Sequence, residues 1–120
     1  MKLAITAQGA DLDSPVDPRF GRARYFLLVD SETGDCTAQD NTQNFNALQG
    51  AGIQAAQNIV GAGAEAVVTG HVGPKAFATL QAAKIQIHTG ASGTAREALE
   101  QFRAGKLPAV GGPDVQAHWV

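Results

Sequence analysis

The 120-residue sequence is poor in cysteine, with Cys36 as its single example. One thiol cannot form an internal disulfide, and the C-x-x-C motifs of redox and zinc sites require a second cysteine. We therefore do not expect a metal cluster that is held by cysteine ligands.

The amino terminus lacks a long apolar run. The stretch Met1–Ala7 is too short for a signal peptide or a membrane span, and Gln8 and Gly9 end it. We therefore expect a cytoplasmic protein that does not enter a membrane.

Neither sign of charge dominates the sequence, because the formal net charge is −2. Nucleic-acid-binding proteins usually have a basic face and a high isoelectric point, so this balance argues against such a partner. Hydrophobic residues make up 44% and charged residues 17%, which is typical of a globular protein rather than a disordered or fibrous one. The length fits one domain over residues 1–120.

The usual catalytic and metal-binding motifs are missing. The sequence has no Walker pattern, no Ser-His-Asp order and no His-Glu-x-x-His motif, and its histidines lack zinc-site spacing. The glycine-rich segments 50–55 and 61–66 imitate a dinucleotide fingerprint, but neither leads from a buried parallel strand into a helix. We therefore expect no catalytic residue and no metal ion ligated by the protein.

Hydrophobic periodicity and turn residues predict five strands and three helices. The expected strands are Lys2–Ala7, Tyr25–Asp30, Asp35–Gln39, Ala66–Thr69 and Ile85–His88. The expected helices are Asn46–Val60, one that begins at Pro74 and buries Phe77 and Leu80, and one that follows a capping box at Thr94 and ends before Gly105. A long loop, Gln8–Arg24, and an irregular tail, 105–120, complete the chain.

The order of these elements predicts an α/β fold, with a mixed five-stranded sheet and helices on both faces. The later strand-helix-strand steps favour parallel neighbours, whereas the hairpin formed by the second and third strands adds an antiparallel member. Ligands of such sheets bind outside the carboxyl ends of the parallel strands. Three segments leave strands at that edge: Ala7–Arg24, Thr69–Pro74 and His88–Thr94.

The long loop has a cluster of arginines in the segment Asp17-Pro18-Arg19-Phe20-Gly21-Arg22. Guanidinium groups present a fixed fork of donors that suits oxyanions or sulfide-rich anions, and glycine allows close approach to the backbone. The alternative is structural, with the arginines pairing to Asp11, Asp13 or Asp17. The position of the loop at the expected ligand edge favours a binding role.

Two glycine-containing turns lead from a strand into a helix, and both could bind an anion through free helix amides. The first, Thr69-Gly70-His71-Val72-Gly73-Pro74-Lys75, adds possible donors at His71 and Lys75. The second runs from His88 to Thr94 and includes Gly90. Either turn could instead be needed for chain geometry alone, with His71 a solvated histidine and Thr94 a helix cap.

Together these segments resemble the dinitrogenase iron-molybdenum cofactor biosynthesis family, also called nitrogenase accessory factor-like proteins. The resemblance covers about Met1–Phe102, and its most specific element is Asp-x-Arg-Phe-Gly-Arg at residues 17–22. It implies a ribonuclease H-like three-layer fold and binding of iron-molybdenum cofactor or its precursors. It also implies similarity to a stand-alone member that holds a molybdenum-copper-sulfide cluster without covalent attachment.

The resemblance transfers a binding role to eight positions, whereas His71, Val72 and Lys75 occupy variable places in the turn, and Cys36 matches no family motif. The transferred positions are Arg19, Phe20, Gly21, Arg22, Thr69, Gly70, Gly73 and Pro74. His88 and Gly90 join the candidate set through their position in the second turn. In this interpretation arginines and backbone amides hold the cluster, and Phe20 provides an apolar wall.

The function predicted from the sequence is therefore a non-catalytic binding or carrier protein for an anionic molybdenum-containing metal-sulfur cluster. Protein partners in cluster assembly or delivery are expected in addition. One alternative is a regulatory module that binds phosphate or a nucleotide at the same site. Another is a ribonuclease H-like metal-dependent hydrolase, which is disfavoured because the facing strands end in Ala7, Thr69 and His88, none of them acidic.

Overall fold

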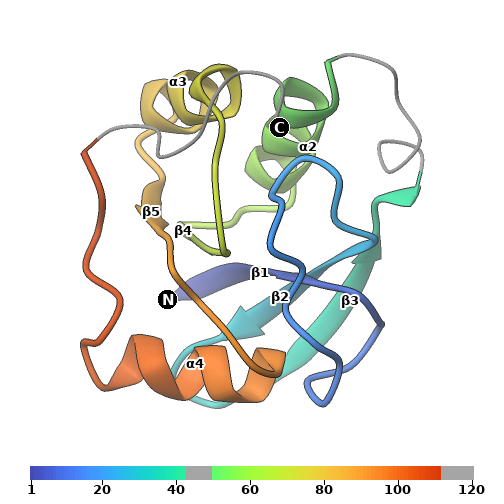
Figure 1. Cartoon of the computed structure of the whole chain (residues 1–120), viewed down its shortest axis with the longest axis vertical. Helices are drawn as coiled ribbons and strands as arrows, with labels where there is room; N and C mark the ends of the chain where they lie inside the picture. Colours follow the sequence, from blue (N-terminus) through green and yellow to red (C-terminus); the bar gives the residue numbers. More distant parts are fainter. Residues whose placement is uncertain (43–49, 112–120) are drawn as a thin grey trace.

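The computed structural model describes residues 1–42 and 50–111 and contains a mixed five-stranded sheet with helices on both faces (Figure 1). The strands are β1 (Lys2–Ala7), β2 (Tyr25–Asp30), β3 (Cys36–Asp40), β4 (Ala66–Val68) and β5 (Gln86–His88). The helices are α2 (Ala51–Gly61), α3 (Pro74–Ala82) and α4 (Ala95–Arg103). The predicted element order and sheet type are confirmed, whereas the ribonuclease H-like classification stays a prediction.

Strand β1 lies at the centre of the sheet, whose order is β3-β2-β1-β4-β5. It pairs antiparallel with β2 and parallel with β4, and β4 pairs parallel with β5. Residues 3–7 of β1 are all buried, as expected for a strand covered on both faces. The parallel strands therefore end side by side at Ala7, Val68 and His88.

Two separate cores lie on the two faces of the sheet. Phe26 and Val67 point toward α2 and α3, where they pack with Ile59, Phe77 and Leu80. The alternate side chains of the same strands point toward α4, where Leu3, Ile5, Leu27 and Val68 pack with Ala98 and Leu99. This alternation, with a period of two, produces three layers, with α2 and α3 on one side and α4 on the other (Figure 1).

Several element boundaries differ from the prediction by one residue, for identifiable reasons. Strand β3 begins at Cys36 because Asp35 still belongs to the turn, in which its carbonyl accepts the Asp30 amide. Strand β5 begins at Gln86 because the Ile85 amide donates to Leu80 and completes the end of α3. Residues 46–49 of the predicted helix 46–60 lie outside the described part of the chain.

The tail is more ordered up to residue 110 than the sequence predicts. Leu107 is buried, and the Val110 amide donates to the Ile87 carbonyl at 2.8 Å. Ala109 forms an isolated antiparallel bridge with His88, so this segment lies along the outer edge of β5. Residues 112–120 lie outside the description. Among the described residues, no helix is long and apolar enough to span a membrane.

Candidate functional site

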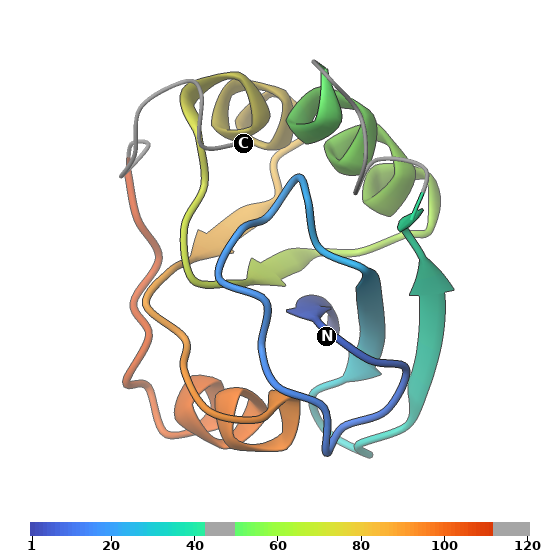
Figure 2. The ribbon, with the colours of Figure 1, turned by 45° about the vertical axis from the view of Figure 1, so that its right-hand side comes forward.

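The three segments predicted to meet at the ligand edge lie at the same end of the molecule's parallel strands (Figure 2). Backbone hydrogen bonds join them to one another. The loop 8–24 pairs with the first turn, because His71 donates to the Pro18 carbonyl at 2.8 Å and Phe20 donates to the His71 carbonyl at 3.2 Å. The two turns are joined in the same way, with Gly90 donating to the Gly70 carbonyl at 3.0 Å. The predicted convergence of these segments is therefore confirmed.

The contact between loop and turn depends on the glycine at position 70. A Cβ atom placed there would lie 2.7 Å from the Pro18 carbonyl oxygen and 2.8 Å from the Pro18 Cα. Both neighbours are backbone atoms, which cannot move aside as a flexible side chain can. Gly70 thus allows residues 17–24, which contain Arg19, Arg22 and Arg24 and are called the arginine loop below, to lie directly on the turn that precedes α3.

A buried pair of threonines supports this contact from below. Thr6 Oγ1 lies 2.8 Å from the Asp17 carbonyl oxygen and 2.8 Å from Thr69 Oγ1. A carbonyl can only accept, so the single hydroxyl proton of Thr6 goes to Asp17, and Thr69 donates to Thr6. This series of hydrogen bonds joins the ends of β1 and β4 to the loop. It gives the fully buried Thr69 side chain a hydrogen-bond partner.

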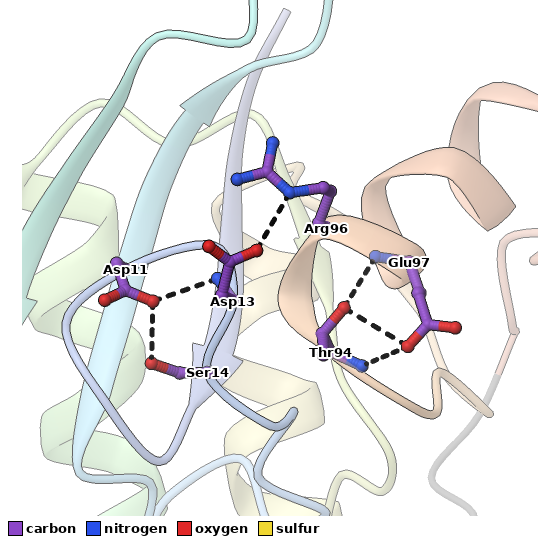
Figure 3. A network of polar contacts seen from close by, with 6 residues as sticks. All are labelled: Asp11, Asp13, Ser14, Thr94, Arg96 and Glu97. Carbon is purple, nitrogen blue, oxygen red and sulfur yellow. Dashed lines mark hydrogen bonds and ion pairs between the residues drawn. The ribbon is translucent and has the colours of Figure 1, made fainter.

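The amino terminus of α4 is fully engaged by protein groups. Ala95 donates to the Ser14 carbonyl and Arg96 donates to the Leu12 carbonyl, at 2.9 and 2.8 Å. Thr94 and Glu97 form the predicted capping box, and Asp13 pairs with Arg96 at 3.1 Å (Figure 3). The first half of the loop therefore occupies the amides that an anion would need at this helix.

The amino terminus of α3 is different. Its N-cap is Gly73, which provides no capping side chain, and Pro74 at the first helical position has no N–H. The amides of Lys75 and Ala76 point out of the first turn without an intrahelical acceptor. In the described ranges 1–42 and 50–111 no other group accepts from them. Of the two turns proposed from the sequence, the first therefore leaves helix amides without a protein acceptor in the described ranges, which is the arrangement an anion requires.

The segments at this edge are rich in positive charge. Residues 15–24, 69–76 and 88–94 contain four Lys or Arg side chains, at 19, 22, 24 and 75, and one acid, Asp17. Asp17 is buried, and its Oδ1 accepts the Arg19 amide at 3.0 Å. Burial raises the pKa of Asp17, against the opposing effects of the Arg19 amide and the Arg19 and Arg24 charges.

The structural alternative for the arginines is correct only in part. Asp17 does lie in the field of Arg19 and Arg24. Asp13 instead pairs with Arg96 of α4, and Asp11 accepts hydrogen bonds from the Asp13 amide and the Ser14 hydroxyl. Of the three acids of this loop, Asp13 therefore connects the loop to α4, and Asp11 stabilises the turn within the loop.

Several predicted binding residues direct their side chains into the protein. Phe20 is 1% exposed and packs against Phe26 in a tilted arrangement, with ring centroids 5.2 Å apart, and Val72 lies in the same core. Their side chains anchor the loop and the turn and do not form the apolar wall expected of Phe20. Arg19, Arg22, His71 and Pro74 are half-buried, and Lys75 is exposed.

The placement of His88 in the site is corrected by the structure. Its ring packs edge-on against Phe102 of α4, with centroids 4.9 Å apart, and its Nδ1 hydrogen-bonds the Leu107 carbonyl. These contacts lie on the α4 face and fix the tail segment. Gly90, from the same turn, is exposed, and its amide is bonded to Gly70.

The sequence did not indicate Asn41, which lies just after β3 and is 1% exposed. Its side-chain amide donates to the carbonyls of Gly21 and Ala23, at 3.3 and 2.8 Å. An asparagine after a strand is an ordinary turn signal, and its partners lie 18 and 20 residues away. No local pattern could have assigned it to the arginine loop.

Cys36 lies far from the candidate site. It pairs with Val29 at the start of β3, whereas the site end of that strand is Asp40, opposite Tyr25. Cys36 is exposed, but partial desolvation and the nearby charge of Asp11 raise the pKa of its thiol, which disfavours the thiolate that a metal would require. In the described residues, no group of three His, Cys, Asp or Glu side chains could hold a metal ion.

Comparison with known proteins gives a family and a close structural match. The model of the dinitrogenase iron-molybdenum cofactor family matches residues 1–105. The apo form of the orange protein from Desulfovibrio gigas is 44% identical, with a TM-score of 0.91 over 95% of this chain and 96% of that one.

Two further proteins are similar to this chain over most of their length. A NifB-like protein of the DUF35 family from Thermotoga is 38% identical, with a TM-score of 0.77 over 88% of this chain and 90% of that one. An uncharacterized protein of Methanocaldococcus jannaschii is 27% identical over 89% of each chain.

Replacing Gly70 by alanine should displace the arginine loop and destabilise the fold. The added methyl would meet the Pro18 backbone, and such overpacking costs about 1–3 kcal/mol in the free energy of unfolding. Gly61→Ala is the matched control, because nothing lies within 4 Å of its added Cβ. Urea unfolding of both variants tests this, and equal stability of the two would contradict a tight contact at Gly70.

Replacing Asp17 by asparagine should change how stability depends on pH. Because the pKa of Asp17 is raised, its contribution is present below the ordinary carboxyl range and is lost as pH rises through the raised value. The substituted amide side chain keeps an oxygen for the Arg19 amide but does not ionise. The Asp17→Asn variant should therefore gain stability relative to the wild type as the pH rises from the ordinary carboxyl range, about pH 4, through the raised pKa of Asp17.

Thermal unfolding across that range measures the effect, with Asp13→Asn as a control for the loss of one exposed acid. A constant difference between Asp17→Asn and the wild type at every pH would show that burial does not raise the pKa of Asp17.

Proposed function

The chain belongs to the dinitrogenase iron-molybdenum cofactor family, and we propose that it binds an anionic molybdenum-containing metal-sulfur cluster without catalysing a reaction. The proposed site consists of Arg19 and Arg22, His71, and the amino terminus of α3 with Lys75. The observation that carries the proposal is the uncapped first turn of α3, which follows the turn that is hydrogen-bonded to the loop containing Arg19 and Arg22. The corresponding turn of α4 is filled by the protein itself.

The chemistry of the residues fits such a cargo. A sulfide-coordinated cluster brings its own ligands and its own negative charge, so the protein needs to provide cations and N–H donors rather than thiolates. Arg19 and Arg22 provide forked donors, and the Lys75 and Ala76 amides add the positive end of a helix dipole. We infer noncovalent binding, since Cys36 lies at the opposite end of β3.

The choice of cargo follows the resemblance. Similarity to the orange protein favours a molybdenum-copper-sulfide cluster, and the family name favours an iron-molybdenum type as the second candidate. Phosphate or a nucleotide would suit the same donors, so direct competition is needed to distinguish them. We further propose that the protein acts in the cytoplasm and transfers its cluster to or from protein partners.

Reversing the charge of Arg22 should weaken cluster binding far more than it weakens the fold. A charge-assisted hydrogen bond is worth about 1.5–3 kcal/mol, so Arg22→Glu should lower affinity by about tenfold to a hundredfold. The stability cost at a half-buried loop position should be on the order of 0.5 kcal/mol. The measurement is a visible-absorption titration with tetrathiomolybdate, with and without copper(I), alongside thermal unfolding.

Lys106→Glu provides the control, because it makes the same change in net charge at an exposed position beyond α4. Affinity should also fall as salt rises, and phosphate should compete weakly. Unchanged binding by Arg22→Glu would place the site elsewhere. Phosphate or ATP that binds more tightly than the thiomolybdate would favour the regulatory module.

Replacing Cys36 by serine should leave cluster binding within about twofold of the wild type, a change of about 0.4 kcal/mol. The side chain is exposed on β3 and lies away from the arginine loop, so its loss removes no predicted contact. The same titration, with metal analysis of the reconstituted protein, tests this. Loss of uptake by a folded Cys36→Ser protein would show that the thiol is a ligand.

A further inference from the structure

We propose that Asn41 is a positioning residue for Arg22, an inference that rests on the proposed function. The two residues come from different parts of the chain, because Asn41 follows the edge strand β3 and Arg22 lies in the long loop before β2. They meet where the β2–β3 ladder ends and the loop begins.

The geometry of this contact restrains the backbone on both sides of Arg22. The Asn41 side-chain amide donates to the carbonyl before Arg22, at Gly21, and to the carbonyl after it, at Ala23. The Asn41 main-chain amide donates to the Arg24 carbonyl at 2.8 Å. One residue therefore bonds three of the four carbonyls between positions 21 and 24.

Burial makes these bonds hard to replace. Asn41 is 1% exposed and Gly21 is also buried, so water is poorly placed to satisfy the two carbonyls once the side chain is removed. Gly21 is adjacent to Arg22 and has no side chain that could hold its own backbone in place. The end of β3 therefore restrains this part of the loop through Asn41.

A fixed backbone matters for a guanidinium that must meet a rigid anion. An arginine loses side-chain and loop entropy when it binds, and a site that is already ordered loses less. Without the Asn41 amide, Arg22 would retain its charge but would be held less firmly. The expected result is weaker binding at an unchanged net charge.

A double-mutant cycle tests this mechanism with tetrathiomolybdate as the probe. Asn41→Ala removes the side-chain bonds but keeps the main-chain bond to Arg24. It should weaken binding about tenfold in the wild-type background and by less than about twofold in an Arg22→Ala background. Such coupling is not expected if Asn41 affects only the stability of the fold.

Thr94→Ala is the matched control, because it removes the cap of α4 and lowers stability away from Arg22. This variant should bind tetrathiomolybdate as the wild type does when both are folded. If Asn41→Ala does not fold, Asn41→Ser retains a donor hydroxyl on the same Cβ and enters the same cycle.

The outcomes separate this inference from the proposed function. Binding that is weakened by Arg22→Ala but not by Asn41→Ala would overturn the positioning role and leave the function intact. A tenfold loss from Asn41→Ala in both backgrounds would overturn it as well. No binding by the wild type, or full binding by Arg22→Ala, would instead contradict the proposed site.

Discussion

The close approach of the Pro18 backbone to Gly70 is the constraint on which the rest of the site depends. It brings a loop from the first third of the chain onto a turn that follows the fourth strand, and the His71 bonds continue from it in both directions. Thr6 and Thr69 support the same contact from the core. The arginines are therefore held by the packing of two backbones, and their loop does not behave as a free surface loop.

Helices α3 and α4 each follow a glycine-containing turn, but their amino termini differ in how the first amides are bonded. The first amides of α4 donate to the loop carbonyls of Leu12 and Ser14 and to the capping box of Thr94 and Glu97, and the bonds to the two carbonyls attach the loop to α4. The amides of α3 receive no such cap. The loop thus stabilises one helix terminus and leaves its basic half beside the other.

Much of the fold could be predicted from the sequence, because its signals are local. The alternation in β1, Pro74 at the start of α3 and the Thr94–Glu97 spacing each determine an element within a few residues. The meeting of the three loops followed from the rule for parallel strands. The roles of individual side chains could not be predicted in this way. Phe20 and His88 lie in segments typical of ligand binding, but their side chains pack inside the protein. Asn41 acts on carbonyls that are distant in sequence, so no periodicity could have indicated it.

The tail segment along β5 makes the two edges of the sheet unequal. One edge is covered by residues 107–110, which are held by the His88 ring and the Val110 amide, so an incoming strand would first have to displace them. The other edge, β3, has exposed side chains and no proline or lysine, the residues that usually discourage strand addition. Among residues 1–42 and 50–111, no strand other than β2 forms a backbone bridge to β3, so the two edges of the sheet differ in what a further strand would have to displace.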